Sequence, residues 1–319
     1  MFRGLCLLTI CSTMLLNPLT AQLSAQPTAQ PTPQQVDRFF DDVYFKFSPT
    51  TGTASGFHQY DTQLEDYSKA GIDAQTKALH QAEKEFAALP PDPDRDLILS
   101  YIRATLLDIE QVRTWEKNPD TYSSGVTNSV FVIMSRTFAP PADRLKSVIA
   151  RERQFPAMFD AARANLKNPP RIYTEIAIEQ LPGIVSFFQN DVPSAFKEVK
   201  DPALLAEFKK SNDQAMDVLK RYQEFLEKDL LARSKGDFRL GGSLFSKKLL
   251  YEEMVGLPLD SLLEIGMTDL HRNQQAFKET AAKIDPSKTP QQILGDVTHD
   301  HPAPDQLLQS FRDVLGGLK

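Results

Sequence analysis

Cysteine is nearly absent from this sequence, and the two that occur, Cys6 and Cys11, lie close to the amino terminus. A basic Arg3 and an apolar stretch from Leu5 to Leu16 surround them, which is the pattern of a secretory signal peptide. The mature chain would therefore contain no cysteine. This excludes disulfides, thiolate zinc sites and cysteine nucleophiles from the mature protein.

Long hydrophobic runs are also missing. The stretch Leu5–Leu16 is too short to cross a hydrocarbon core of about 30 Å as a helix, and no later segment is apolar enough, so we expect no membrane span. Ala21 and Ala25 are small residues suited to a cleavage point. We therefore predict a signal peptide at 1–25, a flexible Pro/Gln leader at 26–33, and an exported protein that is periplasmic or extracellular. Ile10 is too bulky to precede a lipidated cysteine, so plain cleavage is expected.

No basic stripe offsets the formal net charge of -6. Binding to nucleic acid needs clustered Lys and Arg side chains that neutralise phosphates. We therefore expect no nucleic-acid partner.

Motifs for metal binding and nucleophilic catalysis are lacking as well. A helical zinc hydrolase of the commonest kind needs two histidines four residues apart, and no such pair occurs. His299 and His301 lie two apart before Pro302, so on an extended segment they would point to opposite sides. There is no Gly-x-Ser-x-Gly elbow and no phosphate-binding loop. We therefore assign no catalytic residue and no metal ligand in this chain.

The sequence is rich in helical periodicity. Apolar residues recur every three or four positions, and prolines separate the segments, which predicts an all-α, multi-helix body. We expect one helical domain at 34–319, without an internal boundary. The expected helices lie near 35–46, 73–88, 98–112, 142–167, 172–188, 201–230, 260–284 and 303–316.

Two of these helices carry long apolar stripes that predict core packing. Asp201 and Pro202 would cap and open the first helix, and Asp260 would cap the second. The first stripe consists of Leu204, Phe208, Ala215, Leu219, Tyr222, Leu226 and Leu230. The second consists of Leu263, Met267, Leu270, Phe277, Ala281 and Ile284.

Several segments, in their order and spacing, resemble the bacterial family called domain of unknown function 885. They are Gly56-Phe-His-Gln-Tyr-Asp61, Trp115-Glu-Lys-Asn-Pro-Asp-Thr-Tyr122, Ala161-Ala-Arg-Ala-Asn-Leu-Lys-Asn-Pro-Pro170, Gly236-Asp-Phe-Arg-Leu-Gly-Gly-Ser-Leu-Phe245 and Asp300-His-Pro302. The resemblance implies a zincin-like metallopeptidase fold, of which this chain is similar to the amino-terminal half. Members typically run to nearly twice this length, and the resemblance implies zinc bound by a carboxyl-terminal half beyond Lys319.

The resemblance also implies three substrate-binding candidates, His58, Tyr60 and Arg239, as polar members of family-like segments that would face a substrate channel. An alternative stays open for them, because such side chains often bond backbone carbonyls between packed helices. The candidate cofactor, zinc, would not be bound in this chain.

Two hypotheses for function follow. In the first, the chain is an exported helical portion of a zinc-dependent, peptidase-like hydrolase that lacks the metal-binding motif and is inactive alone. In the second, it is a non-enzymatic exported helical binding or interaction protein. The expected partners are a complementary carboxyl-terminal chain or a second copy, and a peptide substrate.

Overall fold

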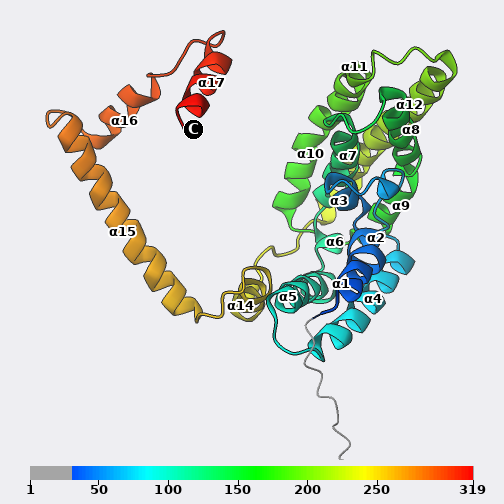
Figure 1. The fold of residues 1–319 in the computed structure, drawn as a ribbon, viewed down its shortest axis with the longest axis horizontal. Helices are drawn as coiled ribbons and strands as arrows, with labels where there is room; N and C mark the ends of the chain where they lie inside the picture. Colours follow the sequence, from blue (N-terminus) through cyan, green and yellow to red (C-terminus); the bar gives the residue numbers. More distant parts are fainter. Residues whose placement is uncertain (1–30, 319) are drawn as a thin grey trace, which may run out of the picture. The chain divides into compact units, whose positions relative to one another are not determined.

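The computed structural model describes residues 31–318 (Figure 1). Within these residues, every regular element is a helix. The prediction of an all-α fold is thereby confirmed, and an isolated bridge between Pro170 and Gly236 is the one β-type pairing in this part of the chain. The predicted signal peptide and most of the predicted leader lie outside the described residues. None of the described helices is both long and apolar enough to cross a membrane.

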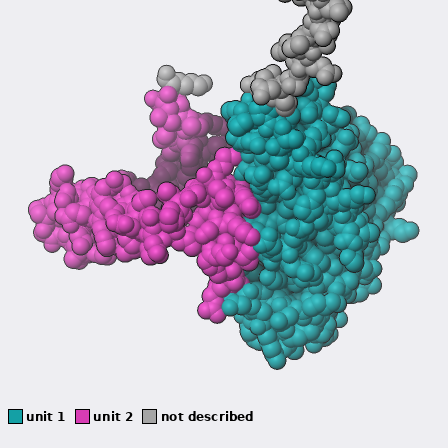
Figure 2. All heavy atoms as spheres, turned by 90° about the horizontal axis from the view of Figure 1, so that it is seen from below, with its two compact units in different colours: residues 1–237 teal, residues 238–319 magenta. Residues whose placement is uncertain are grey.

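The chain divides into two compact units, with the boundary between Asp237 and Phe238 (Figure 2). The sequence had led us to expect one helical domain over 34–319, without a boundary at this point. The junction lies in a short connection that carries no run of Gly, Ser or Pro to mark a linker. The two units are described separately below.

Unit 1 contains most of the helices. They are α1 (Pro33–Phe39), η1 (Phe40–Tyr44), α2 (Phe45–Phe47), α3 (Pro49–Ala54), η2 (His58–Tyr60), α4 (Lys69–Ala87), α5 (Pro93–Leu107), η3 (Asp108–Val112), α6 (Thr114–Lys117), α7 (Asp120–Met134), α8 (Pro141–Glu152), α9 (Phe155–Asn165), α10 (Arg171–Ser186), η4 (Phe187–Asp191), α11 (Val192–Ala195), α12 (Pro202–Phe225), η5 (Leu226–Leu230) and α13 (Leu231–Arg233). η2 is a 3-10 turn, whereas η1, η3, η4 and η5 are π-helical.

The larger core of unit 1 lies among α7, α8, α9, α10 and α12, which pack side by side (Figure 1). The predicted stripe, which runs along α12 and into η5, forms its centre. Ala215, Leu219, Tyr222, Leu226 and Leu230 are all fully buried. The side chain of Asp201 accepts hydrogen bonds from the first backbone N–H groups of α12, as predicted from the Asp-Pro pair.

A second, smaller core lies between α4 and α5 and is closed by α1 and η1. Phe39 makes edge-to-face contacts in this core, with Phe86 at 5.6 Å and with Tyr101 at 6.0 Å between ring centroids. Such contacts add to the free energy of burial because ring edges and faces carry opposite partial charges.

Unit 2 consists of α14 (Gly241–Glu252), α15 (Leu259–Ile284), α16 (Pro290–Thr298) and α17 (Leu307–Gly317). Its buried apolar residues among the described positions are Ala281 and Ile293, where α15 packs against α16.

Three sequence expectations need correction. The segment 142–167 is two helices, α8 and α9, separated by a turn at Arg153 and Gln154. Asp260 is not the cap of α15, because Pro258 occupies the cap position and Asp260 lies in the first helical turn. The stripe of α15 is also not core, since Leu263 is 64% exposed and of its members only Ala281 is buried. A stripe becomes a core only where another element covers it.

Candidate functional site

The first candidate segment joins α3 to α4 and contains the family-like residues Gly56–Asp61. Gly56 has a φ of +92°, a backbone conformation that glycine adopts without steric penalty. The turn that follows presents His58, whose Nδ1 lies 3.2 Å from Oδ2 of the buried Asp61. The imidazole stacks on Phe138, with 3.9 Å between ring centroids. The carboxylate therefore fixes the orientation of the imidazole ring through Nδ1.

Tyr60, in the same turn, points into the protein. It is 8% exposed, and its hydroxyl donates to the backbone carbonyl of Asp41 at 3.3 Å. Its ring lies against Gly52 so closely that a Cβ there would be 2.7 Å from the ring. This arrangement fits the alternative in which the polar side chain bonds a backbone carbonyl between packed elements.

A buried guanidinium attaches this segment to the helical core. Arg151 of α8 is fully buried, and its Nη2 donates to Oγ1 of Thr53 at 2.7 Å and to the carbonyl of Tyr60 at 3.1 Å. Its Nη1 donates to the carbonyl of Ser129 in α7. Desolvation lowers the pKa of Arg151 to about 10, and the nearby carboxylates of Glu65 and Asp61 oppose that shift. The side chain is therefore charged at neutral pH and joins three segments.

The third candidate, Arg239, is exposed and lies in unit 2, in the connection that precedes α14. His58 and Tyr60 lie in unit 1. Neither unit by itself therefore contains all three candidates. His58 and Tyr60 are neighbours in one turn but face different surroundings.

Three other histidines, His80, His299 and His301, have local partners. Nε2 of His80 lies 2.7 Å from Oε1 of Glu110. Nδ1 of His299 lies 2.6 Å from the carbonyl of Gly295, and Nδ1 of His301 lies 3.0 Å from the carbonyl of Pro302. Within residues 31–318, no three His, Cys, Asp or Glu side chains are arranged to hold a metal ion.

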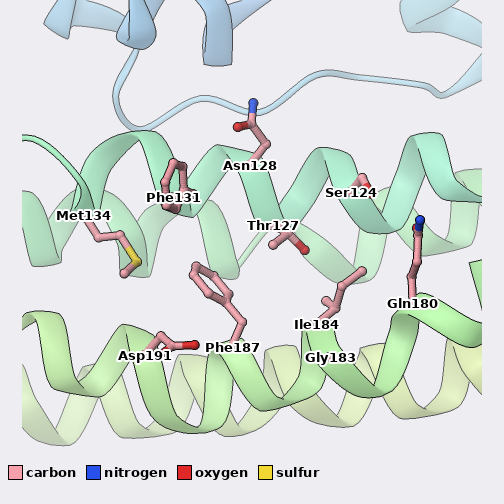
Figure 3. A pocket seen from close by; sticks show the side chains of 10 residues that line it. All are labelled: Ser124, Thr127, Asn128, Phe131, Met134, Gln180, Gly183, Ile184, Phe187 and Asp191. Carbon is pink, nitrogen blue, oxygen red and sulfur yellow. The ribbon is translucent and has the colours of Figure 1, made fainter. Parts of the chain in front are cut away.

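A groove with a volume of about 720 Å³ lies between α7 and α10 (Figure 3). It extends along both helices, and η4 forms one end. The residues that line it are Ser124, Thr127, Asn128, Phe131, Met134, Gln180, Gly183, Ile184, Phe187 and Asp191.

The floor of the groove is apolar and its rim is polar. Met134 points from α7 into the groove, and Phe187 of η4 and Ile184 of α10 point into it from the opposite side (Figure 3). The hydroxyls of Ser124 and Thr127 are already bonded to Asp120 and to the carbonyl of Ser123. In contrast, the side chains of Asn128, Gln180 and Asp191 have no partner among the described residues. Three unpaired polar groups over an apolar floor are typical of a ligand site.

Two helix-breaking residues lie along this groove. Pro182 and Gly183 are both interior to α10, where proline removes a backbone hydrogen bond and glycine costs about 1 kcal/mol relative to alanine. A Cβ at Gly183 would have no atom within 4 Å, so the glycine is not required by packing. Its effect is to leave the groove open. The groove was not predicted from the sequence, although the Pro182-Gly183 pair inside a predicted helix is a visible signal.

A buried carboxylic acid lies apart from these sites, in the core. Glu152 of α8 is fully buried, its Oε2 accepts a hydrogen bond from Oγ of Ser211 at 2.5 Å, and its Oε1 has no partner. Burial raises the pKa of Glu152 to about 8. The side chain is therefore mainly uncharged at neutral pH. It does not line the groove.

The fold and the groove define an all-helical protein with a surface cleft. The chain belongs to the family described as "Bacterial protein of unknown function (DUF885)", whose family model matches residues 49–319. No curated protein matches it. A solved structure described as "a putative lipoprotein of unknown function from Shewanella oneidensis" is similar, with a TM-score of 0.71 and 24% sequence identity. The match covers 89% of this chain and 55% of that one, so the chain spans about half the length of that protein.

Proposed function

We propose that this chain is the helical, peptide-holding portion of an exported, peptidase-like hydrolase, and that the groove between α7 and α10 holds the peptide. The observation that supports the proposal most is the groove itself, with its apolar floor and its unpaired Asn128, Gln180 and Asp191. The family resemblance contributes the expectation of a peptidase-like protein. The word lipoprotein in the description of the solved relative agrees with export.

The dimensions of the groove suit an extended peptide. From Ser124 to Met134 an α-helix rises about 15 Å, which equals four or five residues of extended chain. The amide groups of Asn128 and Gln180 can each donate and accept hydrogen bonds, as the backbone of a peptide requires. The apolar floor would bury alternate side chains of that peptide.

The described residues do not fit a zinc site, since no group of three possible ligands occurs among them. We therefore derive no catalytic step for this chain and assign it binding. Zinc held by a complementary carboxyl-terminal chain remains the expectation from the family resemblance, and we propose that the present chain alone does not hydrolyse peptides.

A second candidate function is that of a non-enzymatic exported binding protein. The same groove favours it, because binding in the groove requires no metal. The two proposals differ in whether a bound peptide is ever cleaved when a complementary chain is present.

The test uses the purified chain and a set of fluorescein-labelled heptapeptides of varied sequence, with binding followed by fluorescence anisotropy. Gly183→Leu should fill the groove and remove binding, since a side chain there meets open space. Gly266→Leu, at another helical glycine with open surroundings in α15, is the matched control and should bind normally. Equal binding by both variants, or no binding by the wild type, would refute the assignment of the groove. Mass spectrometry of the same mixtures should show intact peptides, and cleavage by the chain alone would contradict its inactivity.

A further inference from the structure

The helices that form the groove carry more acidic than basic residues, and Asp191 is the acidic residue among those that line it. Helices α7 and α10 together with η4 contain four carboxylates, on Asp120, Glu175, Glu179 and Asp191, and one basic residue, Arg171. The guanidinium of Arg171 is already paired with Glu175 at 2.7 Å. A ligand that enters the groove therefore meets a field that favours positive charge.

One end of the groove combines aromatic rings with a free carboxylate. Phe187 and Asp191 are the first and last residues of η4, and both line the groove. Phe131 and Met134 approach the same end from α7 (Figure 3). Asp191 is exposed and has no described partner. A side chain that lies along these apolar groups ends at a carboxylate.

The protein contains a filled counterpart of this arrangement. Phe225 and Asp229, also four residues apart, lie where α12 continues into the π-helical η5. The guanidinium of Arg233 lies over the ring of Phe225 at 5.7 Å and bonds the carboxylate of Asp229 at 3.2 Å. A phenylalanine followed by an aspartate four residues later therefore holds an arginine in this fold.

We propose that the Phe187–Asp191 end of the groove binds the side chain of an arginine or lysine in the peptide. This inference rests on the proposed peptide-holding function. The aliphatic stem lies against Phe131, Met134 and Phe187, and the cation bonds Asp191 while it contacts the aromatic rings. An acidic side chain at the same place is repelled by Asp191. The groove thus selects peptides that carry a basic residue among apolar ones.

The experiment measures the affinity of the full chain for three fluorescein-labelled heptapeptides that differ only in the central residue. Leucines flank an arginine, a norleucine or a glutamate. The arginine peptide should bind about tenfold more tightly than the norleucine peptide, because an ion pair with cation–π contact adds roughly that factor. The glutamate peptide should bind more weakly still. Raising the salt concentration should weaken only the preference for arginine.

Asp191→Asn separates this inference from the function on which it rests. It should lower the affinity for the arginine peptide about tenfold and lower that for the norleucine peptide much less, because the amide keeps the shape and polarity of the side chain but not its charge. Asp217→Asn, at an exposed aspartate of α12 without a described partner, is the matched control and should change neither affinity. If all three peptides bind equally to the wild type and Gly183→Leu removes binding, the groove holds peptides but the preference for basic residues is refuted. If no peptide binds, the proposed function falls, and this inference falls with it.

Discussion

The guanidinium of Arg151 donates a hydrogen bond of 3.1 Å to the backbone carbonyl of Tyr60, a residue 91 positions away in the sequence. Helix α8 thereby holds the turn that carries His58, and no sequence pattern indicates that these two segments are in contact. The bond lies in a fully buried environment, so its loss would leave polar groups without water to replace it.

We expect Arg151→Ala to destabilise the protein strongly. The carbonyls of Ser129 and Tyr60 and the hydroxyl of Thr53 would lose their donor, at about 1–3 kcal/mol for each buried group left unpaired. Urea denaturation at pH 7 measures the free energy of unfolding. Arg153→Ala is the control, because Arg153 is exposed and its ion pair with Glu207 contributes under about 1 kcal/mol. Equal effects of the two substitutions would refute the role given to Arg151.

The stability of the protein should fall as the pH rises from 5 to 8, in part because of Glu152. Burial raises the pKa of Glu152 from 4.5 to about 8, so between these values the folded state retains a proton that the unfolded state has lost. The contribution of this group is fully present below pH 4.5, declines by roughly 1.4 kcal/mol per pH unit, and is lost once the pH passes about 8.

Glu152→Gln tests this expectation, since the amide has nearly the same shape and does not ionise. At pH 8 the variant should be more stable than the wild type, and at pH 4.5 the two should be alike. Chemical denaturation at a series of pH values measures the difference. Parallel curves for the two proteins would show that Glu152 is not the group responsible.

Two glycines in helices should respond oppositely to alanine. At Gly52 a Cβ would lie 2.7 Å from the ring of Tyr60, so Gly52→Ala should destabilise the protein by about 1–3 kcal/mol through overpacking. At Gly183 a Cβ meets open space, so Gly183→Ala should stabilise it by about 0.5–1 kcal/mol. Thermal melts of both variants measure the signs. A destabilised Gly183→Ala variant would contradict the open groove.

Export remains a prediction from the sequence, because its residues lie outside the described part of the chain. Processing should leave a mature protein that begins after Ala21 or Ala25. Amino-terminal sequencing of protein recovered from the cell envelope measures the start. Cytoplasmic protein that retains Met1 would contradict it.

Unit 2 should promote association. Helix α17 carries Leu308, Phe311 and Leu315 at 62%, 59% and 60% exposure, on a face that unit 2 leaves without a partner. Such surface is typical of a protein interface. Light scattering over a dilution series should show self-association, and Phe311→Ser should reduce it. A strictly monomeric wild type that binds no hydrophobic dye would refute the expectation.

Local signals were sufficient for much of the secondary structure. The cap and first turn of α12 follow from Asp201 and Pro202, and its buried seam follows from apolar spacing, because both depend on neighbours within a few residues. The same spacing failed for α15. Periodicity reports that one face of a helix is apolar, but it does not report whether another element covers that face.

The sequence by itself determined that the fold is all-α and that the chain lacks a pair of histidines at zinc-binding spacing. It did not predict α7, α14 or α16. Only the tertiary structure decided that Tyr60 turns inward, that Arg151 joins three segments, and that α7 and α10 leave a groove between them. The physical reason is range. Caps and stripes arise from interactions within one or two helical turns, whereas a buried guanidinium or a groove is made by residues that only folding brings together.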